Sequence, residues 1–188
     1  EFEGFIASIG LNAELISPNA SWYKIDPYDG SFYSSGYSES LEESFEKEDI
    51  KPQVYLSPRL SISHPITINS KLYFNYGHYR QVPTTESLFR VQRKAVLNSD
   101  RDIEDLTQLS YIGDPTLEQA RTISYELGYD HALFDTYLLH LAAYYKDITD
   151  QQDWTRYISA NGQVNYSQLT ANSYEDIRGF EADISKMV

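Results

Sequence analysis

The sequence contains no cysteine, few basic residues and no long hydrophobic run. Without cysteine there can be no disulfide framework, thiolate nucleophile or cysteine-ligated zinc. Because no run reaches about 18 apolar residues, we expect no transmembrane helix. Only 15 Lys and Arg stand against 28 Asp and Glu, which gives a formal net charge of −13. This balance argues against nucleic acid as a partner, since phosphate binding needs clustered basic residues.

Signatures of catalysis are also missing. The four histidines are scattered and form no metal-binding pair: His64, His78, His131 and His140. There is no Gly-x-Ser-x-Gly turn and no glycine-rich phosphate loop. The acidic group Asp147, Asp150 and Asp153 has spacing that could suit calcium, but the EF-hand glycine and final glutamate are absent. A solvated loop is the favoured interpretation there, so we predict no enzyme, no metal site and no cofactor.

Tyrosine, in contrast, is abundant. The chain holds 17 tyrosines, more than a packed globular core needs. A tyrosine ring suits places where one end is apolar and the other is wet. Membrane interfaces, sugar-binding surfaces and antibody-like loops are all such places.

Six segments alternate between apolar and polar residues with period two, which predicts β-strands. The segments are Gly4–Ile16, Tyr55–His64, Lys71–Arg80, Arg121–Tyr129, Thr136–Lys146 and Glu175–Lys186. Most are near the roughly 9–11 residues that a tilted membrane strand needs. Pro58 is the weak point of the second segment, because proline belongs at strand edges or bulges.

The connections between these segments alternate in length. Two are short, Pro65–Ser70 and Asp130–Asp135. Three are long and polar, namely Ser17–Val54, Gln81–Gln119 and Asp147–Tyr174. Short turns on one side and long loops on the other are typical of outer-membrane barrels. We therefore predict an all-β, antiparallel transmembrane β-barrel segment of about six strands with long extracellular loops.

Charged and aromatic residues are distributed as such a barrel requires. Arg59, Glu126 and Glu181 fall opposite the apolar faces, so we predict that they face the lumen. Strand tyrosines are interpreted as aromatic girdles at the membrane interfaces: Tyr73, Tyr76, Tyr79, Tyr125, Tyr129, Tyr137, Tyr144 and Tyr145. A soluble β-sandwich that binds carbohydrate or serves adhesion would show the same alternation and stays open as the alternative.

Four runs of residues resemble the TonB-dependent receptors in the order in which that family has them. PRLSISHPI and LYFNYGHYRQVP, within 58–83, resemble a strand–turn–strand segment of the barrel. IGDPTLEQARTISYELGYD, residues 112–130, resembles the segment that leads into a Tyr-Glu-x-Gly strand, with Asp114 where Asn is commoner and Ala120 in place of Glu. YLLHLAAYYKDITD (137–150) and NSYEDIRGFEADISK (172–186) resemble the next two strands. The subgroup with a carboxypeptidase-regulatory-like N-terminal domain is the most similar.

The resemblance implies a barrel of roughly 22 strands with a plugged lumen in the outer membrane of a Gram-negative-type bacterium. It also implies uptake of a scarce ligand, energised by the TonB complex through the plug. Iron chelates, cobalamin, glycans and peptides are the candidate ligands. The plug is absent here, so we expect residues 1–188 to be an internal fragment, a partial barrel domain in contact with outer-membrane lipid.

Aromatic residues in the long loops are the candidate ligand contacts. The set is Trp22, Tyr23, Tyr33, Phe89, Trp154 and Tyr157. Exposed rings can stack on planar ligands, and binding residues favour loops. Packing against neighbouring loops or the plug is the competing interpretation.

Overall fold

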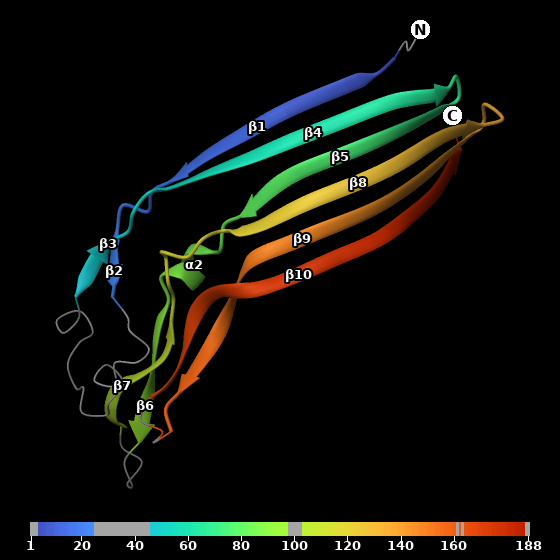
Figure 1. Ribbon diagram of the computed structural model, residues 1–188. Helices are drawn as coiled ribbons and strands as arrows, with labels where there is room; N and C mark the ends of the chain where they lie inside the picture. The colour runs from blue at the N-terminus through green and yellow to red at the C-terminus, as the bar shows by residue number, and fades with distance from the viewer. Residues whose placement is uncertain (1–3, 25–45, 98–102, 161, 163, 187–188) are drawn as a thin grey trace.

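Long antiparallel strands make up most of the chain in the computed structural model, which describes residues 4–24, 46–97, 103–160, 162 and 164–186. Six of them lie side by side (Figure 1): β1 (Ile6–Ile16), β4 (Gln53–Thr67), β5 (Ser70–Gln81), β8 (Ala120–Leu133), β9 (Tyr137–Ile158) and β10 (Asn165–Lys186). Each overlaps one of the six predicted segments, so the six predicted strands are confirmed.

Smaller elements occupy the long connections. They are β2 (Ser21–Tyr23), β3 (Lys47–Asp49), α2 (Thr85–Leu88), β6 (Val91–Leu97) and β7 (Ile103–Ile112). Strands β7 and β6 extend the main sheet, whose order is β1-β4-β5-β8-β9-β10-β7-β6, while β2 and β3 pair separately. In the described part of the chain, no helix has the length and apolar character needed to cross a membrane.

Two of the three long connections contain regular structure that the sequence did not predict. Asp147–Tyr174 is almost entirely strand, because β9 and β10 are each 22 residues long and pair far beyond the other strands. Register shifts interrupt this hairpin between Thr170 and Glu175, which obscures the alternation in the sequence. Gln81–Gln119 holds α2, β6 and β7. Much of the first loop, 25–45, is outside the described residues.

Pro58 lies inside β4, at a position that tolerates it. It is the register partner of Leu11 in β1. The ladder between β4 and β5 begins only at Arg59 and Gly77. Because β4 and β5 do not pair at Pro58, the missing N–H of this proline interrupts no hydrogen bond between β4 and β5.

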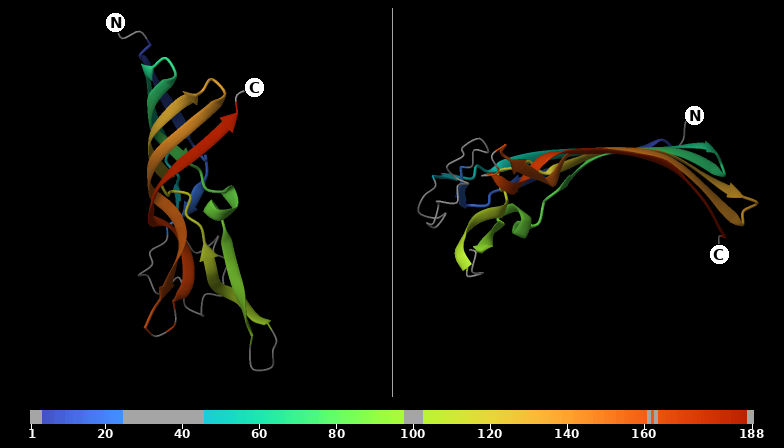
Figure 2. Two further views of the ribbon diagram at one scale, coloured as in Figure 1. Left: turned by 90° about the vertical axis from the view of Figure 1, so that its right-hand side faces the viewer. Right: turned by 90° about the horizontal axis from the view of Figure 1, so that it is seen from below.

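The main sheet is a single curved layer (Figure 2). Its two faces differ in the side chains that they carry. Paired residues in neighbouring strands share a face. One row of the apolar face runs through Ile9, Leu60, Tyr76, Tyr125 and Tyr145. This face is uncovered: the side chains of Ile9 and Phe180 are 84% and 89% exposed. A sandwich would bury such a face against a second large sheet. Among the described residues the second sheet has only two strands, so the sandwich alternative finds no support.

The tyrosines interpreted as aromatic girdles are divided between the two faces of the sheet. Tyr76, Tyr125 and Tyr145 form a row on the apolar face, with successive ring centroids 5.2 Å and 6.3 Å apart. For the three tyrosines of the opposite face, the girdle interpretation is wrong. On that face each tyrosine ring lies against a glycine and occupies the space that a Cβ would fill. The pairs are Tyr79–Gly77, Tyr73–Gly128 and Tyr144–Gly179. This is how an aromatic ring covers a bare strand backbone.

The turn between β8 and β9 carries unusual backbone strain. Phe134 and Asp135 have φ values of 53° and 51°, and Thr136 N donates to Leu133 O at 3.0 Å. Two positive φ angles define a type I′ turn, which favours Asn-Gly. Phe134 therefore occupies a left-handed conformation while its side chain stays 90% exposed.

Replacement of Phe134 by asparagine is expected to stabilise the barrel by about 1 kcal/mol, because asparagine tolerates the left-handed region better. The readout is the thermal midpoint of the full-length receptor in detergent. Ile68→Asn is the matched control, since Ile68 is a fully exposed apolar residue of the other short turn and has no positive φ. An equal rise for both variants would assign the effect to lost apolar surface instead of strain.

Candidate functional site

The face opposite the apolar one carries a network of polar side chains across four strands. Ser61 Oγ donates to Asn75 Oδ1 (2.6 Å), and Asn75 Nδ2 donates to Glu126 Oε1 (3.1 Å). The alternation of β4, β5 and β8 places all three on one face, which we call the polar face. The bonds link neighbouring strands through their side chains in addition to the backbone ladder.

A second part of the network lies nearer the short turns. Asp130 accepts from two directions: Lys71 Nζ lies 3.1 Å from Oδ2, and His140 Nδ1 lies 2.6 Å from Oδ1. The ring of Tyr73 stacks on that of His140, with centroids 6.1 Å apart. These residues belong to β5, β8 and β9. No group of three or more metal-binding side chains is found in the described part of the chain.

The three predicted lumen charges all lie on the polar face, but they do not pair with one another. Arg59 and Glu126 line the same hollow of about 360 Å³. The Arg59 guanidinium lies 4.9 Å from the centre of the Tyr79 ring, while Glu126 accepts from Asn75. Glu181 pairs in register with Ala142, is exposed, and forms no ion pair within the described residues. No ion pair joins any two of these three side chains.

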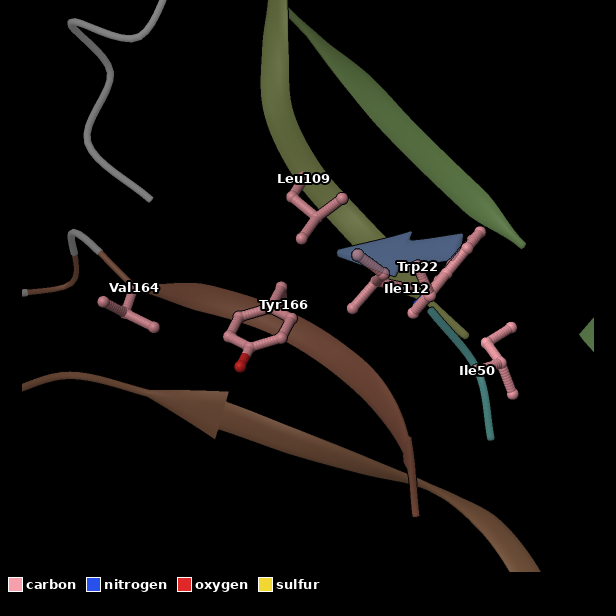
Figure 3. Close-up of a cluster of buried hydrophobic side chains, with 6 residues drawn as sticks. All are labelled: Trp22, Ile50, Leu109, Ile112, Val164 and Tyr166. Carbon is pink, nitrogen blue, oxygen red and sulfur yellow. The ribbon is translucent and has the colours of Figure 1, made fainter. Parts of the chain in front are cut away.

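At the end of the sheet opposite the short turns, residues from three connections form a buried cluster (Figure 3). This outer cluster consists of Trp22, Ile50, Leu109, Ile112, Val164 and Tyr166. They come from β2, from the residue after β3, from β7 and from the β9–β10 hairpin. It is the place where the described chain packs a hydrophobic core, since the six long strands form one uncovered layer.

Trp22 is the centre of the outer cluster. Its indole Nε1 donates to Gly113 O at 2.9 Å, and only 8% of its surface is exposed. The ring packs edge-on against Tyr23 and Phe89, with centroids 5.2 Å and 5.3 Å away. The polar end of the ring is thus satisfied and its faces are covered.

The other predicted ligand contacts are distributed around this cluster. Tyr157 stacks on Tyr166 at 5.4 Å. Trp154 packs edge-on against Tyr111, and the Arg90 guanidinium lies 5.1 Å and 5.8 Å from those two rings. The structure therefore brings Trp22, Tyr23 and Phe89 together and places Trp154 in a separate aromatic–arginine group. Tyr33 is outside the described residues.

Several residues of this site were missed from the sequence. Arg90, Tyr111, Ile112 and Tyr166 all lie in segments that were interpreted as loop. The alternation of Val164, Tyr166 and Gln168 with Asn165, Ser167 and Leu169 was the available signal, but it is short and mostly polar.

Comparison with known proteins gives the same architecture. A family model described as TonB-dependent receptor-like β-barrel matches residues 3–186. No curated protein matches the chain.

Similar solved structures include a double mutant of the Serratia marcescens hemophore receptor HasR with its hemophore HasA and heme. It has 14% identity and a TM-score of 0.55, and the match covers 97% of this chain and 28% of that one. The copper transporter OprC has 14% identity and a TM-score of 0.54 over 99% of this chain and 25% of its own. The siderophore receptor PirA from Pseudomonas aeruginosa has 13% identity and a TM-score of 0.52 over 73% and 26%.

At such identities the solved structures show a shared fold, and the chain spans about a quarter of their length. The family match, in contrast, covers nearly the whole sequence and agrees with the six-stranded curved sheet and its two faces. The chain belongs to the TonB-dependent receptor β-barrel family, whose members are outer-membrane transport receptors.

Proposed function

We propose that the chain forms part of the wall and the mouth of an outer-membrane receptor that takes up a scarce ligand by TonB-dependent transport. The observation that carries the proposal is the uncovered apolar face of the curved sheet, opposite a polar face. The outer edge of β1 pairs with no described strand, and β10 meets β7 only at Ser167 and Gln168. Open edges are not tolerated in hydrocarbon, which supports further strands on both sides.

The polar face is proposed to line the lumen. Arg59, Glu126 and Glu181 would then contact water and a plug domain inside the barrel. That plug would connect the receptor to TonB at the inner membrane. Transport of this kind includes no covalent step, so we propose no enzymatic role.

The ligand is proposed to enter past the outer cluster. Tyr23, Phe89, Trp154 and Tyr157 are proposed as contacts because their rings are only partly buried, and Tyr33 is retained with them. Trp22, whose ring is covered, would hold the surrounding segments in place. The related structures name heme, siderophores and copper as cargo classes, and cobalamin, glycans and peptides complete the candidates.

The first test is membrane dependence. The 188-residue chain made without detergent should aggregate, because the apolar face has nothing to cover it. A soluble monomer that unfolds cooperatively would contradict the proposal. The second test is a binding screen of the full-length receptor against iron chelates, heme, copper, cobalamin, glycans and peptides. Uptake of the bound ligand should then require TonB.

A further inference from the structure

The polar face of the sheet is hollowed around Arg59, over a volume of about 360 Å³ that spans β1, β4, β5 and β8. The register partners of Arg59 on its two sides are both glycines, Gly10 of β1 and Gly77 of β5. The Tyr79 ring covers Gly77, with its hydroxyl oxygen 3.0 Å from the place of a Cβ. Gly10 has no such cover, because the one atom near the place of its Cβ is the Cβ of Arg59, 3.9 Å away. The hollow is therefore open on the side of β1.

Two charges of opposite sign line this hollow without pairing. The Arg59 guanidinium lies 4.9 Å from the centre of the Tyr79 ring, and Glu126 accepts from Asn75. No ion pair joins Arg59 or Glu126 to any other described residue. The two residues are two strands and two positions apart. At about 4.8 Å per strand and about 3.3 Å per residue, their Cα atoms are about 12 Å apart, which separates the charges.

Neutral polar groups lie between the two charges. Three hydroxyl groups and one amide line the hollow, from Ser8, Ser61, Ser124 and Asn75. Ser61 Oγ donates to Asn75 Oδ1 at 2.6 Å, which fixes the amide so that Nδ2 points to Glu126 at 3.1 Å. Such groups can exchange hydrogen bonds with the middle of a polar ligand whose two ends meet the charges.

We propose that the hollow binds a zwitterionic ligand, with its carboxylate at Arg59 and its ammonium group at Glu126. A guanidinium binds a carboxylate through two parallel hydrogen bonds, and the Tyr79 ring holds this one in place. The ligand supplies the counter-charge that each side chain lacks among the described residues. About 12 Å between the Cα atoms accommodates an extended ligand of about two or three amino-acid residues. The inference rests on the proposed function, because it takes the polar face to line the lumen.

The test measures binding of trialanine to the full-length receptor in detergent, by saturation-transfer NMR titration. Trialanine carries both charges, and N-acetyl-trialanine amide has the same length and carries neither. The wild type should bind the free peptide about ten-fold more tightly than the blocked one. Arg59→Gln and Glu126→Gln should each remove this preference.

Two matched variants control for the loss of charge elsewhere. Glu14→Gln makes the same change as Glu126→Gln on the same face, outside the hollow. Arg178→Gln removes an arginine that is already paired with Asp176, at 2.9 Å. Both variants should keep the affinity of the wild type for trialanine.

A third variant fills the hollow without a change of charge. Gly10 lies in a regular strand and has no positive φ, so Gly10→Met should fold with its side chain over the open side of the hollow. Its affinity for trialanine should fall about ten-fold, while its thermal midpoint stays near that of the wild type.

Each outcome decides the proposal. Equal binding of free and blocked trialanine, or wild-type affinity in Arg59→Gln, Glu126→Gln or Gly10→Met, would overturn it. So would a loss in Glu14→Gln as large as that in Glu126→Gln. A receptor that inserts into vesicles but does not bind trialanine contradicts only the zwitterion site. A folded receptor that does not insert at all contradicts the proposed function.

Discussion

Replacement of Trp22 by alanine is expected to separate the three outer connections from one another. A buried tryptophan contributes about 3–5 kcal/mol relative to alanine, and this ring contacts Tyr23, Phe89 and the Gly113 carbonyl. Hydrogen exchange of the full-length receptor should show lost protection in 103–112 and 164–169. Protection of 120–133 should persist, because β8 is held by the ladders to β5 and β9.

Trp154→Ala is the matched control for this experiment. Trp154 packs against Tyr111 and lies outside the buried cluster, so its loss should affect exchange only locally. Trp22→Phe keeps an apolar ring but leaves the carbonyl of Gly113 without its donor, with an expected cost of about 1–3 kcal/mol. Unchanged exchange in Trp22→Ala would mean that the outer connections are held together by other contacts.

Gly113→Ala should disrupt the same region by a different route. A Cβ at Gly113 would collide with the backbone carbonyl groups of Ser87 and Leu88, and backbone cannot rotate away as a side chain can. Gly113 is also fixed on both sides, since its N–H donates to Arg90 O at 2.7 Å and its carbonyl accepts from Trp22. We expect a loss of about 3 kcal/mol in the stability of the packing between α2 and β7.

Gly10→Ala separates this collision from the general effect of replacing a glycine. A Cβ at Gly10 would lie 3.9 Å from the Cβ of Arg59, an ordinary contact. Its hydrogen-exchange pattern should match that of the wild type. Wild-type protection of 103–112 in Gly113→Ala would contradict the close packing of α2 against Gly113.

The strands of the barrel could be recognised from the sequence because their signal is local. Alternation in segments such as Lys71–Arg80 and Arg121–Tyr129 reports directly on two faces of unlike surroundings. The short turns follow from the same pattern. The outer half of β9 and β10 was missed because both sides of that hairpin carry polar residues, and register shifts break the period.

The candidate site was only partly predictable. Arg59, Glu126 and Glu181 were placed on the correct face, since the pleat alone decides the face. Their partners were not predictable, because Arg59 reaches a tyrosine of its neighbouring strand and Glu126 reaches Asn75. The sequence identified the loop aromatics as a group. It did not predict which of these rings are buried by neighbouring residues.

Composition and period-two alternation thus establish an all-β chain of six long strands with one apolar and one polar face. Tertiary structure alone decides how the long connections pack. Trp22 and Gly113 are 91 residues apart in sequence, yet one hydrogen bond joins them. No periodicity encodes such a contact, because it depends on where the ends of separate hairpins meet. For the same reason only the register between β5 and β8 places Arg80 opposite Arg121.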